Sequence, residues 1–359
     1  RHVRYKPQGV VAVLGPFNLP GHLPNGQIIP ELVAGNTVVF KPSEFTAGVG
    51  QRLMEIWDSL GLPSGVLNLL QGAQDTGKAL SLHAEINGLY FVGSAQTGQA
   101  IHQAFAGHPE KILALEMGGN NPLIVAQVND VRAAACLAVQ SAFLTSGQRC
   151  TCARRIIVFQ HKAGEMFLEQ FLAMASKIRV GPYTERPEPF MGPVITRGIG
   201  QRWLEIQNDL EKRGGNPLLK MRSLYDNPAM LTPGIMDVTA VADREDREIF
   251  APFAQIVRVK NFDEAITEAN RTVYGLVAGI LSDDAKLYEK FFREVKAGVI
   301  NWNQQMTGAS SESPFGGLGQ SGNHRPSGYF TVDYCVDPVA SLEQERLQMP
   351  EKIPPGLEL

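Results

Sequence analysis

Cys150 has the surroundings in this sequence that best suit covalent chemistry. It lies in the polar segment SGQRCT (residues 146–151), which follows a stretch with helical spacing. The neighbouring Arg149 would stabilise a thiolate, and the thiolate is the reactive form of a cysteine. We therefore expect Cys150 to be a nucleophile. The alternative is that it is a small buried hydrophobic residue, as many cysteines are.

Glu116 is a candidate general base. It lies in the segment LEMGGNNP (residues 115–122), where an apolar strand runs into two glycines. Burial without a cation raises the pKa of a carboxylate towards neutrality, where it can accept and return a proton. The alternative is a carboxylate that accepts hydrogen bonds from neighbouring backbone amides.

Polar side chains also follow the first two predicted strands. Asn18, in the turn PFNLP (residues 16–20), could hold a developing oxyanion, although asparagine is also common in ordinary turns. Lys41 and Glu44 follow the second strand, where a carboxylate can accept hydrogen bonds from ribose hydroxyls and repel a 2'-phosphate. A solvated loop is the alternative for this pair.

A glycine-containing turn after another strand is suited to a pyrophosphate, because it opens a helix whose backbone amides and dipole attract anions. It lacks the glycine spacing of the common dinucleotide fingerprint and the Lys-Ser/Thr pair of a P-loop. This segment comprises Gly93, Ser94, Ala95, Gln96, Thr97 and Gly98.

The elements that position these residues alternate between strand and helix. Short apolar runs predict buried parallel strands at residues 10–14, 37–40, 66–70, 88–92 and 112–115. Helical spacing predicts helices at residues 23–34, 48–60, 76–82 and 96–105. This pattern is typical of a doubly wound α/β layer with a parallel sheet.

A second α/β unit is predicted downstream. We expect strands at 123–126, 155–159, near 235–241 and near 256–259, and helices at 131–145, 162–177 and near 200–212. Pro and Gly indicate surface loops at 181–192 and 214–234, and residues 329–342 predict an edge or interface strand.

The composition favours a globular protein that acts on a small molecule. Lys and Arg total 33 against 36 Asp and Glu, so the net charge of -3 gives no general attraction to nucleic acid or to an anionic membrane. We find no apolar run of membrane-spanning length and no signal-peptide pattern, and we expect a cytoplasmic protein. The four cysteines are too few for a disulfide framework. Cys150 and Cys152 lack the partners of a zinc site, so no metal is expected.

Taken together and in this order, the segments resemble the aldehyde dehydrogenase superfamily over nearly the whole chain. The resemblance implies that Cys150 is the nucleophile, Glu116 the base, and Asn18 with the Cys150 amide the oxyanion hole. It implies NAD as cofactor, and a cycle that passes through a cysteine thiohemiacetal and a thioester. Lys41 and Glu44 would hold the adenosine ribose.

The same resemblance extends to the rest of the cofactor site. Residues 93–98 would hold the pyrophosphate, and Phe17 would line the site. In the segment EIFAP (residues 248–252), Glu248 would contact the nicotinamide ribose and Phe250 would pack near the ring. The segment PFGG (residues 314–317) continues the series.

A narrower resemblance, to family members that act on carboxylated semialdehydes, is carried by residues 15–26, 116–122, 301–305 and 321–327. A substrate with several carboxylates needs cationic or hydrogen-bonding partners, and Arg149 beside the nucleophile is one candidate. The predicted substrate-binding residues are Arg149, Thr151, Thr307, Gly308, Ala309 and Ser310.

The resemblance divides the chain into an incomplete NAD-binding domain (1–118), a catalytic domain (119–328) and a C-terminal interface strand and tail (329–359). The chain opens at Arg1, and family members carry a long N-terminal portion before this point, so we expect a fragment. With that portion, a homodimer or higher homo-oligomer is expected. Without that portion, apolar surface stays exposed to water, which costs a free energy of about 25 cal/mol per Å².

Two other functions are weighed. A dehydrogenase that passes the acyl group to coenzyme A is disfavoured by Glu116, because a positioned base promotes hydrolysis. A non-catalytic homologue that keeps the fold is favoured only by the expected missing portion.

Overall fold

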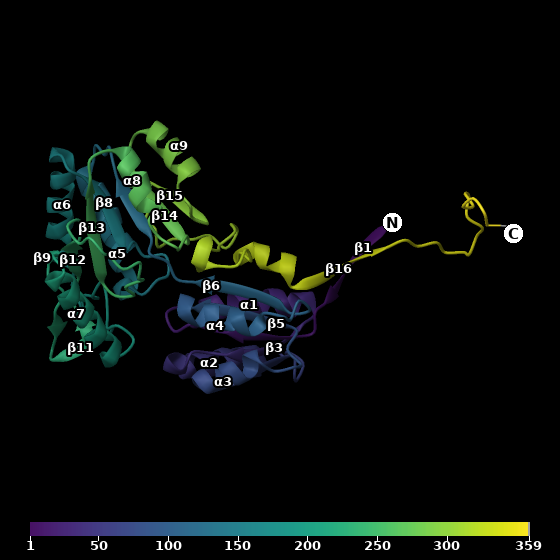
Figure 1. Cartoon of the computed structure of the whole chain (residues 1–359). Helices are drawn as coiled ribbons and strands as arrows, with labels where there is room; N and C mark the ends of the chain where they lie inside the picture. Colours follow the sequence, from purple (N-terminus) through teal and green to yellow (C-terminus); the bar gives the residue numbers. More distant parts are fainter. Residues whose placement is uncertain (358–359) are drawn as a thin grey trace.

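The first third of the chain forms a five-stranded parallel sheet in the order β4-β3-β2-β5-β6. In this computed structural model, which describes residues 1–357, Figure 1 shows this sheet and its helices as the purple and blue lobe. All five predicted strands are confirmed, with small differences at their ends. They are β2 (Val10–Leu14), β3 (Thr37–Lys41), β4 (Leu67–Leu69), β5 (Gly88–Gly93) and β6 (Ile112–Met117).

Helices cover both faces of this sheet, as the doubly wound pattern predicts. Val11 and Val13 of β2 pack with α1 and α2, whereas Ala12 and Leu14 pack with α3 and α4. Successive strand residues point to opposite faces, so a strand buried on both sides must be apolar throughout. The helices are α1 (His22–Ala34), α2 (Ala47–Ser59), α3 (Gln74–Ser81) and α4 (Ala95–Phe105).

A second sheet of seven strands has the order β15-β14-β7-β8-β13-β12-β9, and it is parallel except for β9. It forms the teal and green lobe of Figure 1. Its strands are β7 (Pro122–Val125), β8 (Arg155–Phe159), β9 (Asn216–Leu219), β12 (Gly234–Asp237), β13 (Phe253–Val259), β14 (Val277–Leu281) and β15 (Val299–Trp302). The predicted α/β fold class is therefore confirmed for both sheets.

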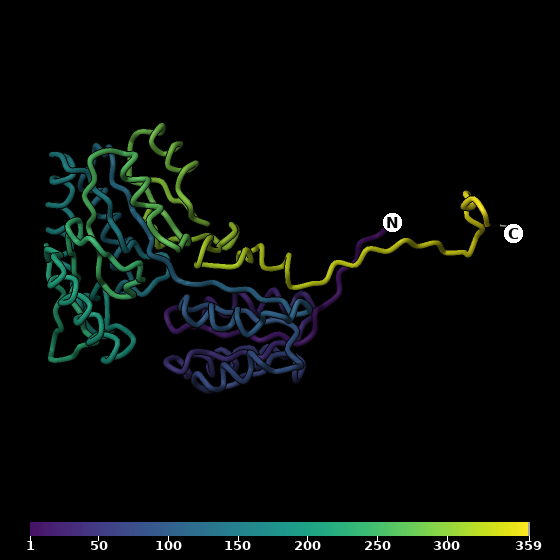
Figure 2. Tube along the Cα trace, viewed as in Figure 1, coloured from purple at the N-terminus to yellow at the C-terminus, as the bar shows by residue number. Residues whose placement is uncertain are grey.

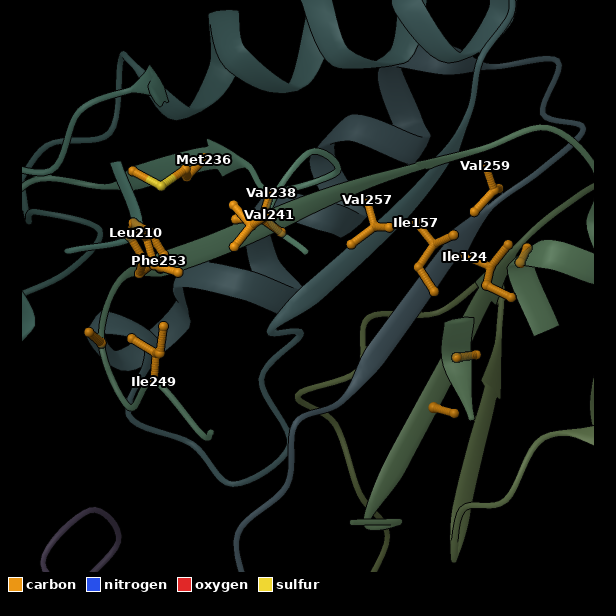
Figure 3. Packing of buried hydrophobic residues seen from close by; sticks show 14 of the residues in the cluster. Ile124, Ile157, Leu210, Met236, Val238, Val241, Ile249, Phe253, Val257 and Val259 are labelled. Atoms are coloured by element: carbon orange, nitrogen blue, oxygen red, sulfur yellow. The ribbon is translucent and has the colours of Figure 1, made fainter. Parts of the chain in front are cut away.

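Helices also cover both faces of the second sheet. Helices α5 (Val131–Phe143) and α6 (Lys162–Ala175) pack on one face. Helices α7 (Arg197–Lys212), α8 (Phe262–Ala269) and α9 (Ala285–Glu294) pack on the other. Figure 3 shows part of this second apolar cluster, in which Ile124, Ile157 and Val257 extend from three neighbouring strands.

Some sequence predictions were wrong in detail. Residues 214–234, predicted as a loop, contain β9 and a hairpin of β10 (Ser223–Leu224) and β11 (Asn227–Leu231). The helix predicted to reach residue 145 ends at Phe143, and the strand predicted to reach 241 ends at Asp237. Elements α8, β14, α9 and β15 were not predicted.

The two ends of the chain pair with each other. Of the strand predicted at residues 329–342, only β16 (Val336–Ser341) is present, whereas residues 328–334 form a 3-10 segment. Strand β16 pairs antiparallel with β1 (His2–Pro7), which was not predicted. Figure 2 shows the β1–β16 pair extending away from both lobes, with the residues up to 357 continuing beyond it. Just before β16, the 3-10 segment Gly328–Tyr334 packs against α1, and Tyr334 stacks on Tyr90 with ring centroids 5.9 Å apart. The predicted domain limits and the predicted homo-oligomer stay predictions.

No helix within residues 1–357 combines the length and apolar character needed to cross a bilayer.

Candidate active site

The predicted functional residues of the first sheet follow strands whose carboxyl ends share one edge. Strands β3, β2, β5 and β6 are parallel neighbours, and they lead into Lys41, Asn18, residues 93–98 and Glu116. Beyond β6 the chain crosses to β7 through residues 118–121, so Glu116 lies at the passage between the two sheets. Ligands bind at this edge in open α/β sheets.

A strained turn presents Cys150. After α5 ends, Thr145, Ser146 and Gly147 have φ values of 56°, 56° and 68°. A Cβ atom at Gly147 would lie 1.9 Å from the Ala251 carbonyl oxygen, so only glycine fits there. The turn is thereby held against the segment of residues 248–252, and Cys150 is half-buried at its end. Strain of this kind is typical of functional sites.

Asn121 ties the Cys150 turn to the passage between the sheets. Its side-chain amide donates hydrogen bonds to the carbonyl oxygens of Cys150, at 2.6 Å, and Cys152, at 3.0 Å. The backbone carbonyl of Asn121 accepts a hydrogen bond from the Arg154 backbone amide at 3.0 Å. The position of Glu116 and the position of Cys150 therefore depend on the same short linker.

Arg149 and Thr307, both predicted to bind substrate, are in contact. Arg149 donates to the Thr145 hydroxyl at 2.9 Å and to the Thr307 carbonyl at 3.1 Å. The Thr307 hydroxyl already donates to the Gln140 carbonyl at 3.5 Å, so its hydrogen is in use. Of the remaining predicted substrate residues, Thr151 is buried, and Gly308, Ala309 and Ser310 are exposed.

The electrostatic surroundings of Cys150 differ from the prediction. Burial raises the pKa of the thiol above its ordinary value, and the nearby carboxylates of Glu116 and Glu248 raise it further. The cation that lowers this pKa is Arg154, whereas the sequence predicted Arg149. Arg149 points its guanidinium at Thr145 and Thr307 instead. In this state Cys150 is a neutral thiol, which needs a base to become nucleophilic.

Glu116 has the properties of such a base. Its side chain is 6% exposed, and burial raises its pKa to about 8. The Ser327 hydroxyl lies 3.3 Å from one carboxylate oxygen and 3.0 Å from the Phe315 carbonyl, so its one hydrogen has two acceptors, of which an ionised Glu116 is the stronger. The other Glu116 oxygen has no hydrogen-bond partner among residues 1–357. The predicted rise in pKa is confirmed, and the alternative of a carboxylate satisfied by backbone amides is wrong.

The residues predicted to bind the nicotinamide end of a cofactor lie together. The Phe17 and Phe250 rings contact edge to face, with centroids 5.9 Å apart, and join the loops of the two sheets. The Glu248 carboxylate lies 3.6 Å from the Arg154 guanidinium. One Glu248 oxygen is buried without a hydrogen-bond partner in the described part of the chain. An acceptor without a partner among the described residues, two positions before the Phe250 ring, fits a nicotinamide riboside.

The residues predicted to bind the adenosine end lie along the first sheet. Lys41 is buried, its ammonium donates to the Pro42 carbonyl at 2.6 Å, and burial lowers its pKa. Glu44 is exposed at the start of a 3-10 turn, Glu44–Thr46. Ser94 caps α4 by accepting from the Thr97 amide at 3.2 Å. These features fit a ribose and a pyrophosphate at one sheet edge.

Comparison with known proteins decides the family. The sequence profile of the aldehyde dehydrogenase family matches residues 1–338. The chain belongs to the aldehyde dehydrogenase family. Family membership, predicted from the motifs, is thereby confirmed, and with it an enzyme that oxidises aldehydes.

Two relatives have the same name. The chain is 53% identical over 357 residues to an N-succinylglutamate 5-semialdehyde dehydrogenase of Chromobacterium violaceum, and 54% identical to one of Ectopseudomonas mendocina. In both cases the alignment covers 99% of this chain and 73% of the relative. The chain thus spans about three quarters of their length.

Solved structures of the family have the same fold. A putative aldehyde dehydrogenase from Burkholderia cenocepacia is 32% identical, with a TM-score of 0.88, covering 94% of this chain and 69% of that one. A 1-pyrroline-5-carboxylate dehydrogenase from Thermus with bound NAD is also 32% identical, with a TM-score of 0.88, covering 94% and 66%. The NAD prediction is consistent with this neighbour.

Sequence reasoning missed the roles open to Arg154 and Ser327. Arg154 precedes the apolar run of β8, and an arginine at that position predicts no particular contact. Ser327 lies more than two hundred residues from Glu116, so only the fold brings them together. Within residues 1–357, no cluster of three or more His, Cys, Asp or Glu side chains is arranged as a metal site.

Proposed function

We propose that the chain oxidises N-succinyl-L-glutamate 5-semialdehyde to N-succinyl-L-glutamate with NAD, in arginine catabolism by the succinyl route. The identity of 53–54% to relatives with this name supports the substrate, as does the narrower motif resemblance. The observation that carries the chemistry is a half-buried Cys150, at the end of a strained turn, near enough to the buried Glu116 for the charge of that carboxylate to raise the pKa of the thiol.

Cys150 is the nucleophile in this proposal. Glu116 accepts the thiol proton, because a carboxylate with a pKa of about 8 is a competent base near neutrality. The sulfur then bonds to the aldehyde carbon and forms a thiohemiacetal oxyanion. The Asn18 side-chain amide and the Cys150 backbone amide stabilise that oxygen by hydrogen bonds.

The cofactor residues orient the dinucleotide against Cys150. Glu248, with its unpartnered oxygen, would accept a hydrogen bond from the nicotinamide ribose, and Phe17 and Phe250 would pack near the ring. Lys41 and Glu44 bind the adenosine ribose, and the turn of residues 93–98 binds the pyrophosphate. When bound, NAD supplies the hydride acceptor, and Cys150 is left as a thioester.

Glu116 completes the reaction by activating water. After the thioester forms, Glu116 first releases the thiol proton to solvent and then takes a proton from water, which attacks the acyl carbon. Glu116 returns that proton to the departing Cys150 sulfur, which leaves the acid and the free thiol. The buried position of Glu116 suits this second use, since its pKa lets it shed the proton again. A base beside the thioester favours its hydrolysis by water over transfer of the acyl group to coenzyme A.

The substrate's carboxylates require donors near Cys150. Arg149 is half-buried and retains unused N–H groups beside its bonds to Thr145 and Thr307. We assign one carboxylate to Arg149. The backbone of Thr151 and Thr307 and the exposed segment of Gly308, Ala309 and Ser310 complete the substrate-binding site.

The test is NADH formation by the chain with N-succinylglutamate semialdehyde, glutamate semialdehyde and succinate semialdehyde, each with and without coenzyme A. We expect kcat/KM to be at least tenfold higher for the succinylated aldehyde, with no dependence on coenzyme A. The Arg149→Ala variant should raise KM selectively for that substrate. Equal KM effects on a neutral aldehyde would refute the Arg149 assignment, and no NADH from any aldehyde would favour a non-catalytic homologue.

A further inference from the structure

Arg154 is a wholly buried arginine four residues after Cys150. A buried guanidinium is strongly destabilising unless its charge and N–H groups find partners. The proposed chemistry gives Arg154 no role, yet its guanidinium contacts parts of the site: the Gly147 and Arg149 carbonyls, Glu248 and the Phe250 ring. Those contacts indicate what it does.

The guanidinium holds the turn before the nucleophile. One terminal nitrogen donates to the Gly147 carbonyl at 2.6 Å, and the other donates to the Arg149 carbonyl at 2.8 Å. These carbonyls lie on the strained turn that ends at Cys150. Because a planar guanidinium fixes two acceptors at once, it defines the path of this turn in a way that an ammonium cannot.

The same guanidinium faces the predicted cofactor residues. It lies 3.6 Å from the Glu248 carboxylate, and its central carbon lies 5.1 Å from the centre of the Phe250 ring. The 3.6 Å separation is an ion pair but too long for a good hydrogen bond. Glu248 is therefore balanced in charge while one of its oxygens keeps its capacity to accept a hydrogen bond.

We propose that Arg154 is a positioning residue that fixes the Cys150 turn through two carbonyls and serves as the shared counter-charge of Cys150 and Glu248. This inference rests on the proposed function, since it assigns Cys150 as nucleophile and Glu248 as cofactor ligand. Charge effects agree with it: Arg154 lowers the pKa of the Cys150 thiol and of the Glu248 carboxyl, in opposition to burial.

The neighbouring Arg155 provides a matched control. It is also buried, but its guanidinium contacts the Asn120 carbonyl, Glu268 and the Ala269 carbonyl rather than the Cys150 turn or Glu248. A substitution there disturbs the core without touching the proposed charge balance.

The experiment measures the rate of iodoacetamide alkylation of Cys150 at fixed pH, resolved by peptide mass spectrometry. It requires neither aldehyde nor NAD, so it can succeed even where the proposed activity fails. The exposed Cys136 on α5 is the internal reference. Arg154→Met should slow Cys150 alkylation about tenfold, because each unit of rise in pKa lowers the thiolate fraction tenfold. Cys136 should be unaffected, and so should Cys150 in Arg155→Lys.

Two further variants separate charge from packing. Adding Glu248→Gln to Arg154→Met should recover several-fold of the lost rate, because the Glu248 charge raises the pKa of Cys150. A packing defect would not be rescued in this way. Arg154→Lys keeps the positive charge, so the alkylation rate of Cys150 should stay within about threefold of that in the parent protein. Its kcat should fall more than about tenfold, because the contact with the two carbonyls is lost.

The proposal is overturned if Arg154→Met alkylates at the parental rate, or if the double variant shows no recovery. Should Arg154→Met not fold, Arg154→Lys decides. Parental kcat in that variant overturns the positioning role, and a loss of kcat with retained alkylation supports it.

Discussion

At the residue scale, Glu116 has a raised pKa because it is buried and no cation among residues 1–357 offsets that burial. It is buried, one oxygen has no partner among the described residues, and only the Ser327 hydroxyl opposes the rise in its pKa. This pKa of about 8 lies within the pH range in which the activity of the enzyme can be assayed. Turnover that depends on Glu116 as a base should therefore rise with pH through about 8 and level off above it.

Ser327→Ala tests this relation. Loss of the hydroxyl removes the hydrogen bond that lowers the Glu116 pKa, so the midpoint of the rise in kcat should move to higher pH, by about half a unit to one unit. Ser327→Thr keeps a hydroxyl and should keep the midpoint. The pH profile of steady-state kcat measures it, and a midpoint that moves down in Ser327→Ala would contradict the role of Ser327.

The sequence was sufficient to select the residues proposed to react, but not the side chains that surround them. An apolar strand that runs into glycines predicts a buried carboxylate, and Glu116 is one. The adjacent Arg149 was the natural choice of cation for Cys150, but side-chain direction decides, and the electrostatic partner is Arg154. Contacts such as Ser327 with Glu116 depend on long-range folding and leave no local signal.

At the scale of elements, the turn between α5 and Cys150 determines where the sulfur lies. Gly147→Ala would place a Cβ 1.9 Å from the Ala251 carbonyl oxygen, in a left-handed conformation. The backbone must shift to relieve that clash, and a displacement of about 1 Å can lower catalysis a hundredfold. We expect kcat to fall by at least that factor.

Gly107→Ala is the matched control for this variant. Gly107 also has a positive φ, of 90°, but a Cβ there meets nothing within 4 Å. The change should lower the free energy of unfolding by about 1 kcal/mol and leave kcat unchanged. If both variants lose stability equally and neither loses kcat, the Gly147 turn does not position Cys150.

Element prediction succeeded for most strands that are buried on both faces, missed the equally buried β14, and failed at the edge strand β9. Continuous apolar runs predict β2 and β5, because both their faces meet helices. The edge strand β9 contains Pro217 and lies among Gly, Pro and Asn residues that are typical of loops, so nothing local separates it from one. Its strand geometry comes from pairing with β12.

At the scale of the whole molecule, Gly322 and Asn323 cover the edge strand β6 of the first sheet. The Asn323 side chain bonds to the backbone of β6 as a neighbouring strand would. Its carbonyl oxygen accepts a hydrogen bond from the Leu115 backbone amide at 2.8 Å, and its NH₂ group donates one to the Leu113 carbonyl at 2.7 Å. Next to it, Gly322 forms an isolated antiparallel bridge with Glu116. The strand that carries the proposed base is thus held by residues about two hundred positions later.

Asn323→Ala should therefore affect stability and catalysis together. It leaves two backbone groups of β6 without protein partners, so the free energy of unfolding should fall by about 2 kcal/mol and kcat should fall several-fold. Urea unfolding followed by tryptophan fluorescence measures the first. Arg325→Ala, which removes an exposed side chain two residues away, should change neither. A stable Asn323→Ala variant with full activity would show that this contact is dispensable.

Long-range pairing was the least predictable part of the chain. The tail strand was anticipated as an edge or interface strand, but its partner β1 lies at the opposite end of the sequence. The contact of Phe17 with Phe250 likewise joins loops of two sheets. Periodicity reports which residues are buried, and it does not report which segments bury them.

The central claim, a covalent intermediate on Cys150 that Glu116 resolves, is tested most directly by intact-protein mass spectrometry of Glu116→Gln mixed with NAD and N-succinylglutamate semialdehyde. Without Glu116 the Cys150 proton must pass to solvent, but the charge that raises the pKa of that thiol is also gone, so the account predicts a slower yet detectable burst of NADH followed by slow turnover. It also predicts an added mass of one succinylglutamyl group on the intact protein, which digestion places on the peptide that contains Cys150 and which is absent in Cys150→Ala. Normal turnover by Glu116→Gln with no adduct, or an adduct on another residue, would contradict it.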